Sequence, residues 1–419
     1  MQIRSMRRLR LREKEIFHIF YDSNLISLIT MKFLSDKQEE DPNNFEEKYG
    51  FTFRDYEIFT KIIAKFNNED ETYKADLKSA LNALKNSKND YIKKIYEKVP
   101  ESSIDLDEFE RVMSFLDDDE DPIIKFNYVM DTINEHTISV SNSIIINLLL
   151  SNLAQTNHIP RNVYIPSCKE ATAITNLNEF QKATLYEEDE KYYSYALQNI
   201  ILHEVDLNKI TLKNKKIDSD KKYDTIISTF PVRKRGHVTF NERVKTMMDY
   251  INDTTYLIEK LDENAKFVLP ALKNMIVRRD SYDLRKHLIE NNLLDAVIEY
   301  KSSFRPDEVT ILVINKAKTD DNVLFIKPKI IFLMDMPRIN EEIIQCYSTR
   351  EIIPKFSNLV TKEKIMENDY NFNPNRYVNT LDYEHKDLQK IIQKQSEYTN
   401  EIRQLDKDID NMLEKLINN

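Results

Sequence analysis

The sequence predicts an α/β protein with a Rossmann-like core of seven strands, an all-helical region before it and a coiled-coil helix after it. Three observations support this prediction. Apolar residues recur at helical spacing over residues 1–125, whereas short β-branched runs alternate with amphipathic stretches over 126–330. A heptad pattern then fills much of 381–419, after a polar connector at 331–380.

The N-terminal region contains four amphipathic stretches with acidic spacers. They are EIFHIFYDSNLISLITMKFL, RDYEIFTKIIAKF, LKSALNALKNS and LDEFERVMSFLDD. The acidic run DDDEDP at 117–122 follows them, and such a charged stretch is typical of a solvated break between domains. We therefore place the first domain boundary near residue 125.

The central region alternates strands and helices, as a sheet with helices on both faces requires. The expected strands are NVYIP, ATLYEED, KITLKN, YDTIISTF, AKFVLPAL, LDAVIEY and EVTILVINKAK. The helices between them are EKYYSYALQNIILHE, NERVKTMMDYINDTTYLIEKLDE and SYDLRKHLIENN. Only KSSFRPD separates the last two strands, which is too short for a crossover helix, so these strands are expected to pair antiparallel.

The C-terminal stretch has an apolar residue at alternating spacings of three and four. The series is Leu388, Ile391, Tyr398, Ile402, Leu405, Ile409, Met412 and Leu416, with the polar Gln395 in one position. A helix with such a stripe must bury it against another surface. Two alternatives remain open: the chain's own helical domain and a helix of a partner.

Composition excludes several classes of function. The two cysteines, Cys168 and Cys346, cannot form a disulfide framework or a multi-thiolate metal site, and the scattered histidines show no ligand spacing, so we expect no metal. No apolar run reaches the ~18–20 residues of a membrane span, and the basic N-terminus lacks a signal-peptide core. We expect a cytoplasmic protein without membrane contact. A net charge of −10 means that any DNA contact must be local or supplied by a partner.

The chain has two glycines, Gly50 and Gly236, although the average share of about 7% would give nearly thirty. A glycine-rich phosphate loop is therefore excluded. Part of this scarcity reflects a general compositional bias, since Asn, Lys, Ile, Tyr and Asp are abundant.

Several motifs together resemble the modification (M) subunits of type I restriction-modification systems, which are adenine-N6 DNA methyltransferases. The most specific is ENDYNFNPNRYV at 367–378. The segments 185–206, 284–304 and 309–318 agree with the family in order. The resemblance covers residue 126 to the end. It implies a fold that binds S-adenosylmethionine, flips an adenine out of DNA and works with a specificity subunit that recognises the DNA sequence.

The family's cofactor loop, Asp-Pro-x-x-Gly-Ser-Gly-Gly, is changed in this chain. The residues at its positions are Ile165, Pro166, Ser167, Cys168, Lys169, Glu170, Ala171 and Thr172. Pro166 remains, but the acid and all three glycines are replaced. Side chains at Lys169 and Glu170 are expected to fill space that the cofactor needs, and a positive φ is costly there.

Two further sites follow from the resemblance. The acid that ends the second strand, which binds ribose hydroxyls in Rossmann-like folds, is expected at Asp189, unless Asp189 is only a solvated strand end. Glu187 and Glu188 replace the family's Gly and Gln. The substrate motif Asn-Pro-Pro-Phe, whose first residue and proline carbonyl hold the adenine amine, falls on Thr229, Phe230, Pro231 and Val232. A register shifted by one residue puts Ser228 first.

The family's Phe-Tyr-Thr-Pro cofactor contact falls on Ser139, Val140, Ser141 and Asn142, where no aromatic remains and where Ser141 or Asn142 is expected to cap the next helix. Two basic clusters follow strands four and five. Arg233, Lys234, Arg235, Arg278 and Arg279 are their candidate DNA contacts. Basic residues at this edge would hold a DNA backbone without reading its sequence, unless they are simple surface residues.

These observations favour an M-subunit-like protein that is catalytically inactive and acts by binding a specificity subunit, another M-like subunit or DNA within a complex. We therefore expect no cofactor. One alternative is an active DNA adenine methyltransferase with a remodelled pocket, which would use S-adenosylmethionine. Another is a free-standing interaction or defence protein on the same fold.

Overall fold

The computed structural model of the chain describes residues 24–97, 99, 121–137, 144–214, 220–229, 240–271, 273–301, 308–329, 335–379, 395–399, 402 and 404–405. Contacts divide the chain into two units, Met1–Val378 and Asn379–Asn419. The predicted helix at 106–118 and the predicted cap at 141–142 lie outside the described residues. The domain boundaries expected from the sequence, including the one near residue 125, stay predictions.

The first unit is built on a nine-stranded mixed sheet with the order β3-β2-β1-β4-β5-β7-β6-β8-β9. The strands are β1 Asn162–Pro166, β2 Lys182–Tyr186, β3 Ile210–Lys213, β4 Tyr223–Ile227, β5 Leu261–Ala271, β6 Leu294–Lys301, β7 Glu308–Asn315, β8 Asn322–Ile326 and β9 Ser357–Thr361. The strands β1 to β5 run parallel, and β7 pairs antiparallel with both β5 and β6. The α/β class and the antiparallel pair predicted from the sequence are confirmed.

The sheet differs from the prediction by two strands. β8 pairs parallel with β6, and β9 pairs antiparallel with β8, so the seven expected strands become nine. β9 carries only two apolar residues, Leu359 and Val360, which is too weak a pattern to predict. Strands two and four also end earlier than expected, at Tyr186 and Ile227.

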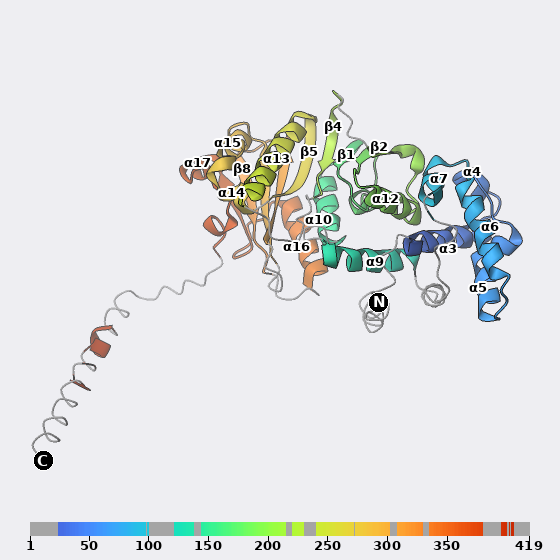
Figure 1. Cartoon of the computed structure of the whole chain (residues 1–419). Coiled ribbons are helices and arrows are strands. Elements are labelled where there is room, and N and C mark those ends of the chain that lie inside the picture. The colour runs from blue at the N-terminus through green and yellow to red at the C-terminus, as the bar shows by residue number, and fades with distance from the viewer. Residues whose placement is uncertain are drawn as a thin grey trace, which may run out of the picture. The chain divides into compact units, whose positions relative to one another are not determined.

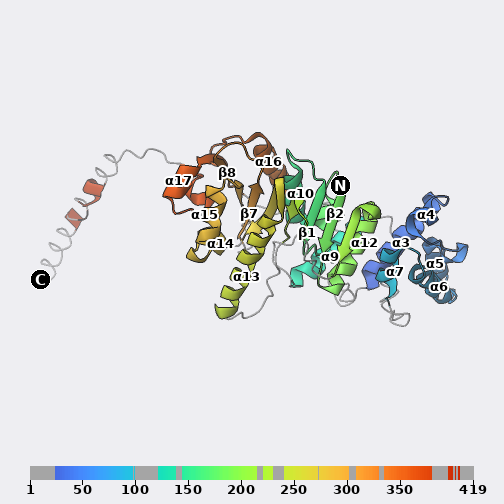
Figure 2. The same ribbon diagram turned by 90° about the horizontal axis from the view of Figure 1, so that it is seen from above.

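Helices cover both faces of the sheet, as Figure 2 shows. On one face lie α9 Pro122–Thr137, α10 Ile144–Gln155, α11 Thr172–Thr175, α12 Glu190–Leu202 and α16 Met336–Thr349. On the other lie α13 Phe240–Glu259, α14 Lys273–Val277, α15 Tyr282–Glu290 and α17 Lys362–Glu367. Each face has its own apolar core, because alternate residues of a strand point to opposite faces. In β1, for example, Val163 and Ile165 belong to one core and Tyr164 to the other.

The N-terminal region is helical, as predicted, and lies against α12 (Figure 1). Its helices are α3 Asn24–Glu40, α4 Phe45–Tyr49, α5 Phe59–Asn67, α6 Tyr73–Lys85 and α7 Asp90–Glu97. Polar contacts fix this arrangement: the Thr30 hydroxyl donates to Gln198 Oε1 at 3.0 Å, and the Tyr91 hydroxyl donates to the Ile210 carbonyl at 3.0 Å. The helical region is thereby tied to the β3 edge of the sheet.

The stretch expected as a connector is folded onto the sheet. It supplies α16, β9 and α17, and the signature ENDYNFNPNRYV contains the short 3-10 helix η6 Pro374–Arg376. Phe372 of that signature is fully buried, and its backbone N–H donates to the Ile276 carbonyl at 2.9 Å. The signature therefore closes the second face of the sheet. Among the described residues, no helix combines the length and apolarity that a membrane crossing needs.

The second unit is described over a short stretch. Residues 395–399 are helical, and Tyr398, Ile402 and Leu405 of the heptad series are each more than half exposed. The predicted coiled coil stays a prediction.

Candidate cofactor and substrate site

The predicted cofactor loop meets Thr229, the first residue of the predicted substrate motif, at the carboxyl edge of the parallel strands. β1 and β4 are neighbours, so the loops that follow them lie side by side. The hydroxyl of Thr229, after β4, donates a hydrogen bond to the Ser167 carbonyl, after β1. Thr229 is 2% exposed, so its hydroxyl serves to join the two loops.

The loop after β1 has a glycine-like backbone without glycine. Ser167, Lys169 and Ala171 have φ values of 72°, 51° and 61°. Lys169 and Ala171 occupy two positions where the family sequence has glycine. Such left-handed conformations cost a residue with a Cβ about 1–2 kcal/mol each. The loop therefore has the backbone conformation that glycine adopts most easily, although it contains no glycine.

Non-glycine residues also take left-handed conformations elsewhere in the described part of the chain. Eleven non-glycine residues of the described part have a positive φ, whereas Gly50 is the single glycine there that does. Arg350, for example, ends α16 in the left-handed conformation that helices usually give to glycine. The missing glycines of the loop therefore follow the general composition of this chain, and the function of the loop must be argued from its side chains.

Glu187 is the acid that directly follows β2. Its side chain is 2% exposed, and Oε2 accepts the backbone N–H of Lys169 at 2.8 Å. The other oxygen, Oε1, accepts the N–H of Asp189 at 3.1 Å and lies 3.6 Å from the Lys169 ammonium. Both oxygens of this strand-end acid are therefore bound inside the site.

The side chain of Lys169 lies over the site. Its ammonium group is 4.9 Å from the centre of the Tyr192 ring and only 12% of the side chain is exposed. Contact with a carboxylate and with an aromatic face stabilises the ammonium in this position. Lys169, Glu187 and Tyr192 form what we call the Lys169 cluster.

The other residues predicted here have structural contacts. Asp189 caps α12, accepting the N–H groups of Lys191 and Tyr192. Glu170 is 1% exposed and turns toward α10, where its Oε1 accepts from Asn147 at 3.3 Å. Ile165 and Pro166 end β1, and burial raises the pKa of the Cys168 thiol well above its usual range. A thiol in that state is unreactive.

The ribose contact predicted at Asp189 stays a prediction. Strand two was expected to run through Asp189, whereas it ends at Tyr186, so Glu187 is the acid that directly follows β2. The sequence reasoning did not single out Glu187 as a site residue, and the end of the apolar run at Tyr186 was the available signal.

The remaining predicted residues divide into two groups. Phe230, Pro231, Val232, Arg233, Lys234 and Arg235 lie outside the described residues. Arg278 and Arg279 are exposed, beyond the carboxyl end of β5 on the short stretch between α14 and α15. Arg278 lies 3.5 Å from Asp280, in an ion pair in which both side chains are 42% exposed. Arg278 and Arg279 lie at the carboxyl edge of the sheet, as predicted, and their contact with DNA stays a prediction.

The sequence is similar to a known protein family and to proteins of that family. Residues 168–386 match the family model of the N-6 DNA methylases. The methylase subunit of the type I restriction enzyme MpnII of Mycoplasma pneumoniae is 23% identical over an alignment of 266 residues, and the match covers 52% of this chain and 48% of that protein. The chain thus matches about half the length of this relative.

Solved structures agree on the fold. The methyltransferase subunit of a type I restriction-modification system from Streptococcus thermophilus superposes with a TM-score of 0.63 at 16% identity, covering 88% of this chain and 95% of that one. A structure on complex assembly and conformational transition of the type I system has a TM-score of 0.52 at 11% identity, covering 95% and 94%. The fold is thus an α/β methyltransferase fold with a helical N-terminal region. The family model spans more than half of the sequence, and the chain belongs to the N-6 DNA methylase family.

Proposed function

We propose that this chain is an M-subunit-like component of a type I restriction-modification assembly that binds its partners without transferring methyl groups. The Lys169 cluster is the single observation that carries the proposal. A working cofactor site needs a free acid at the end of β2 and an accessible loop after β1. Here the acid and the loop bind each other.

The residues present do not fit S-adenosylmethionine. Glu187, the first acid after β2, has both oxygens bound to Lys169 and Asp189, and Asp189, where the resemblance places the ribose contact, caps α12. The Lys169 ammonium lies over the loop after β1 with 12% of its side chain exposed, and a positive charge there repels a sulfonium cation. The helix after the loop, α11, has four residues and adds little favourable dipole.

One observation favours the alternative, an active methyltransferase with a remodelled pocket. The backbone at Lys169 and Ala171 has the left-handed conformation that glycine adopts most easily, at two positions where the resemblance places glycine. The backbone could then still approach a cofactor if the Lys169 side chain swung away. Binding of the cofactor separates the two proposals.

Two surfaces support a role in binding. Tyr398, Ile402 and Leu405 give the C-terminal unit an exposed apolar stripe, the kind of surface that a partner helix covers. Arg278 and Arg279 add exposed positive charge at the carboxyl edge. We propose a specificity subunit, or a second M-like subunit, as the partner of the stripe, with DNA bound as part of the complex.

Co-expression with a specificity subunit tests the proposal. We expect a stable complex, and we expect no transfer of labelled methyl groups to adenine in DNA carrying the recognition site. Leu405→Asp should remove the complex because it puts a charge in the apolar stripe, while the exposed Glu397→Ala, outside the series, should leave it intact. Methylation above background would support the active enzyme, and a failure to bind any specificity subunit would support a free-standing interaction protein.

A further inference from the structure

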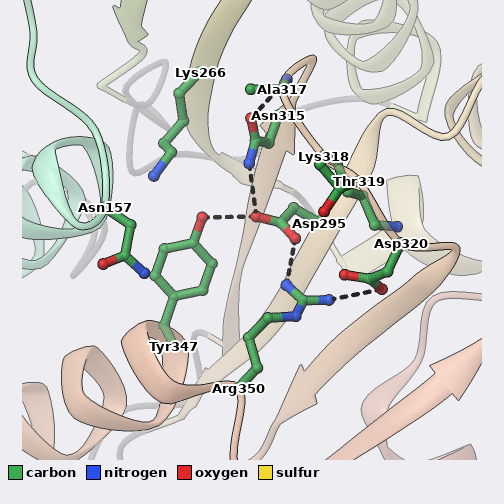
Figure 3. Close-up of a pocket in the computed structure, with 10 residues that line it drawn as sticks. All are labelled: Asn157, Lys266, Asp295, Asn315, Ala317, Lys318, Thr319, Asp320, Tyr347 and Arg350. Atoms are coloured by element: carbon green, nitrogen blue, oxygen red, sulfur yellow. Dashed lines mark hydrogen bonds and ion pairs between the residues drawn. The ribbon is translucent and has the colours of Figure 1, made fainter.

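A polar cavity lies at the edge of the sheet opposite the Lys169 cluster. Asp295 is near the start of β6, and Asn315 is the last residue of the antiparallel β7, so both lie at the amino edge of the parallel strands. The cavity holds about 150 Å³. Lys266 of β5, Lys318 after β7, and Tyr347 and Arg350 near the end of α16 also line it. Figure 3 shows these side chains around the central Asp295 carboxylate.

The negative charge in this cavity is already bound by neighbouring side chains. Asp295 Oδ2 accepts from the Tyr347 hydroxyl at 2.8 Å and from Asn315 Nδ2 at 3.2 Å, and its Oδ1 accepts from Arg350. The second carboxylate, Asp320, lies 3.4 Å from the same guanidinium (Figure 3). The one arginine therefore contacts both carboxylates.

The two lysines lack such partners. The Lys266 ammonium donates to the Thr156 carbonyl, and Lys318 donates to Asn292 Oδ1 at 3.0 Å and to the Leu294 carbonyl at 2.9 Å. All these acceptors are neutral, and no carboxylate of the described residues is within ion-pair distance of either ammonium. Lys266 is 2% exposed. Burying a cation against neutral groups is unfavourable, and an anion in the cavity would offset that cost.

We propose that this cavity binds a small oxyanion with two negative charges, of the phosphate or sulfate type, between Lys266 and Lys318. The charge of the lining favours it, because three cationic and two carboxylate side chains line the cavity. The size limits the ligand: about 150 Å³ is well below the ~300–1,000 Å³ of pockets for drug-sized ligands, so a nucleotide does not fit inside.

Binding depends on pH with a definite sign. Burial lowers the pKa of Lys266 and of Lys318 to about 8. Both are therefore charged in weakly acidic solution and neutral in alkaline solution, and affinity falls as the pH rises through this range. The charged or titratable groups that face the two lysines are Asp295, Asp320, Asp321, Arg350, His158 and Tyr347. Burial lowers the pKa of His158, so it is neutral over the same range.

Calorimetric titration of the full chain with sodium sulfate tests the proposal, because sulfate keeps its charge when the pH changes. We expect binding at pH ~6.5 and an affinity at pH ~9.5 that is weaker by about tenfold or more. The reason is that pH ~9.5 lies more than one unit above the pKa of about 8 of both lysines, so less than about a tenth of each remains charged. Inorganic phosphate should compete with sulfate, whereas the same concentration of chloride should not.

Two variants make the result specific. Lys266→Met and Lys318→Met should each weaken sulfate binding by about tenfold or more, because each removes one cation from the lining. Methionine suits a buried site, so Lys266→Met is expected to fold. Lys316→Met is the matched control: this lysine also donates to a carbonyl, of Leu261 at 3.0 Å, but it does not line the cavity. Absence of sulfate binding, or equal binding in all three variants, would overturn the proposal.

Discussion

Replacing Asp295 with alanine is expected to lower the free energy of unfolding by about 2–4 kcal/mol, because its buried carboxylate holds the Tyr347 hydroxyl and the partly exposed Arg350 guanidinium. The Asp295 side chain is 5% exposed and binds Tyr347 and Arg350 at the end of α16 and Asn315 of β7. Without it, the cationic lining of the amino-edge cavity has no central carboxylate. Urea unfolding followed by circular dichroism measures the change.

The control for this experiment is the nearby Asp321→Ala. Asp321 is exposed, and a surface substitution of this kind usually changes stability by less than about 0.5 kcal/mol. Asp295→Asn keeps the shape and can still accept hydrogen bonds, so it should lie between the two. If Asp295→Ala were as stable as Asp321→Ala, the network around Asp295 would have no part in holding α16 on the sheet.

A second large effect is expected at Arg285, whose side chain is buried on α15. Its Nε donates to the Tyr370 carbonyl at 2.7 Å, and its NH1 donates to the Arg278 carbonyl at 2.7 Å and to Ser281 Oγ at 2.6 Å. Burial lowers the pKa of its guanidinium. Arg285→Ala leaves these buried acceptors with fewer partners and should cost about 2–4 kcal/mol in the unfolding experiment.

Arg285 also explains why two distant segments of the family resemblance go together. It belongs to the stretch 284–304, and Tyr370 belongs to the signature at 367–378. Lys286→Ala is the matched control, because Lys286 is the next residue of α15, is 45% exposed and has only a surface ion pair with Glu290 at 3.9 Å. Equal stability of the two variants would show that the guanidinium does not join these segments.

Much of the fold could be predicted from the sequence because its signals were local. The strands from β1 to β7 have continuous apolar or β-branched runs, and the seven-residue link KSSFRPD forced the antiparallel pair β6–β7. β8 and β9 were missed, because the pairing of β8 with β6 and β9 is a long-range contact. The left-handed residues, such as Arg350 at the end of α16, were also missed because arginine gives no such signal.

The candidate site could be located but not described from the sequence. The motif order placed Ser167, Lys169 and Thr229 near one another, and the hydrogen bond between Thr229 and Ser167 agrees with that. The absence of glycine at Lys169 is only a weak sign of lost cofactor binding, because other left-handed positions in the described part of the chain also lack glycine. The contact between Lys169 and Glu187 carries the argument instead, and only the three-dimensional structure contains it.

The central claim is that the Lys169 cluster takes the place of an adenosyl cofactor. Calorimetric titration of the chain with S-adenosylmethionine tests it most directly, with a family member that methylates DNA as the positive control. We predict no heat of binding up to a concentration of about 1 mM, the range of very weak complexes. A dissociation constant near 1 μM, about 8 kcal/mol of binding free energy, would contradict the claim and support an active methyltransferase.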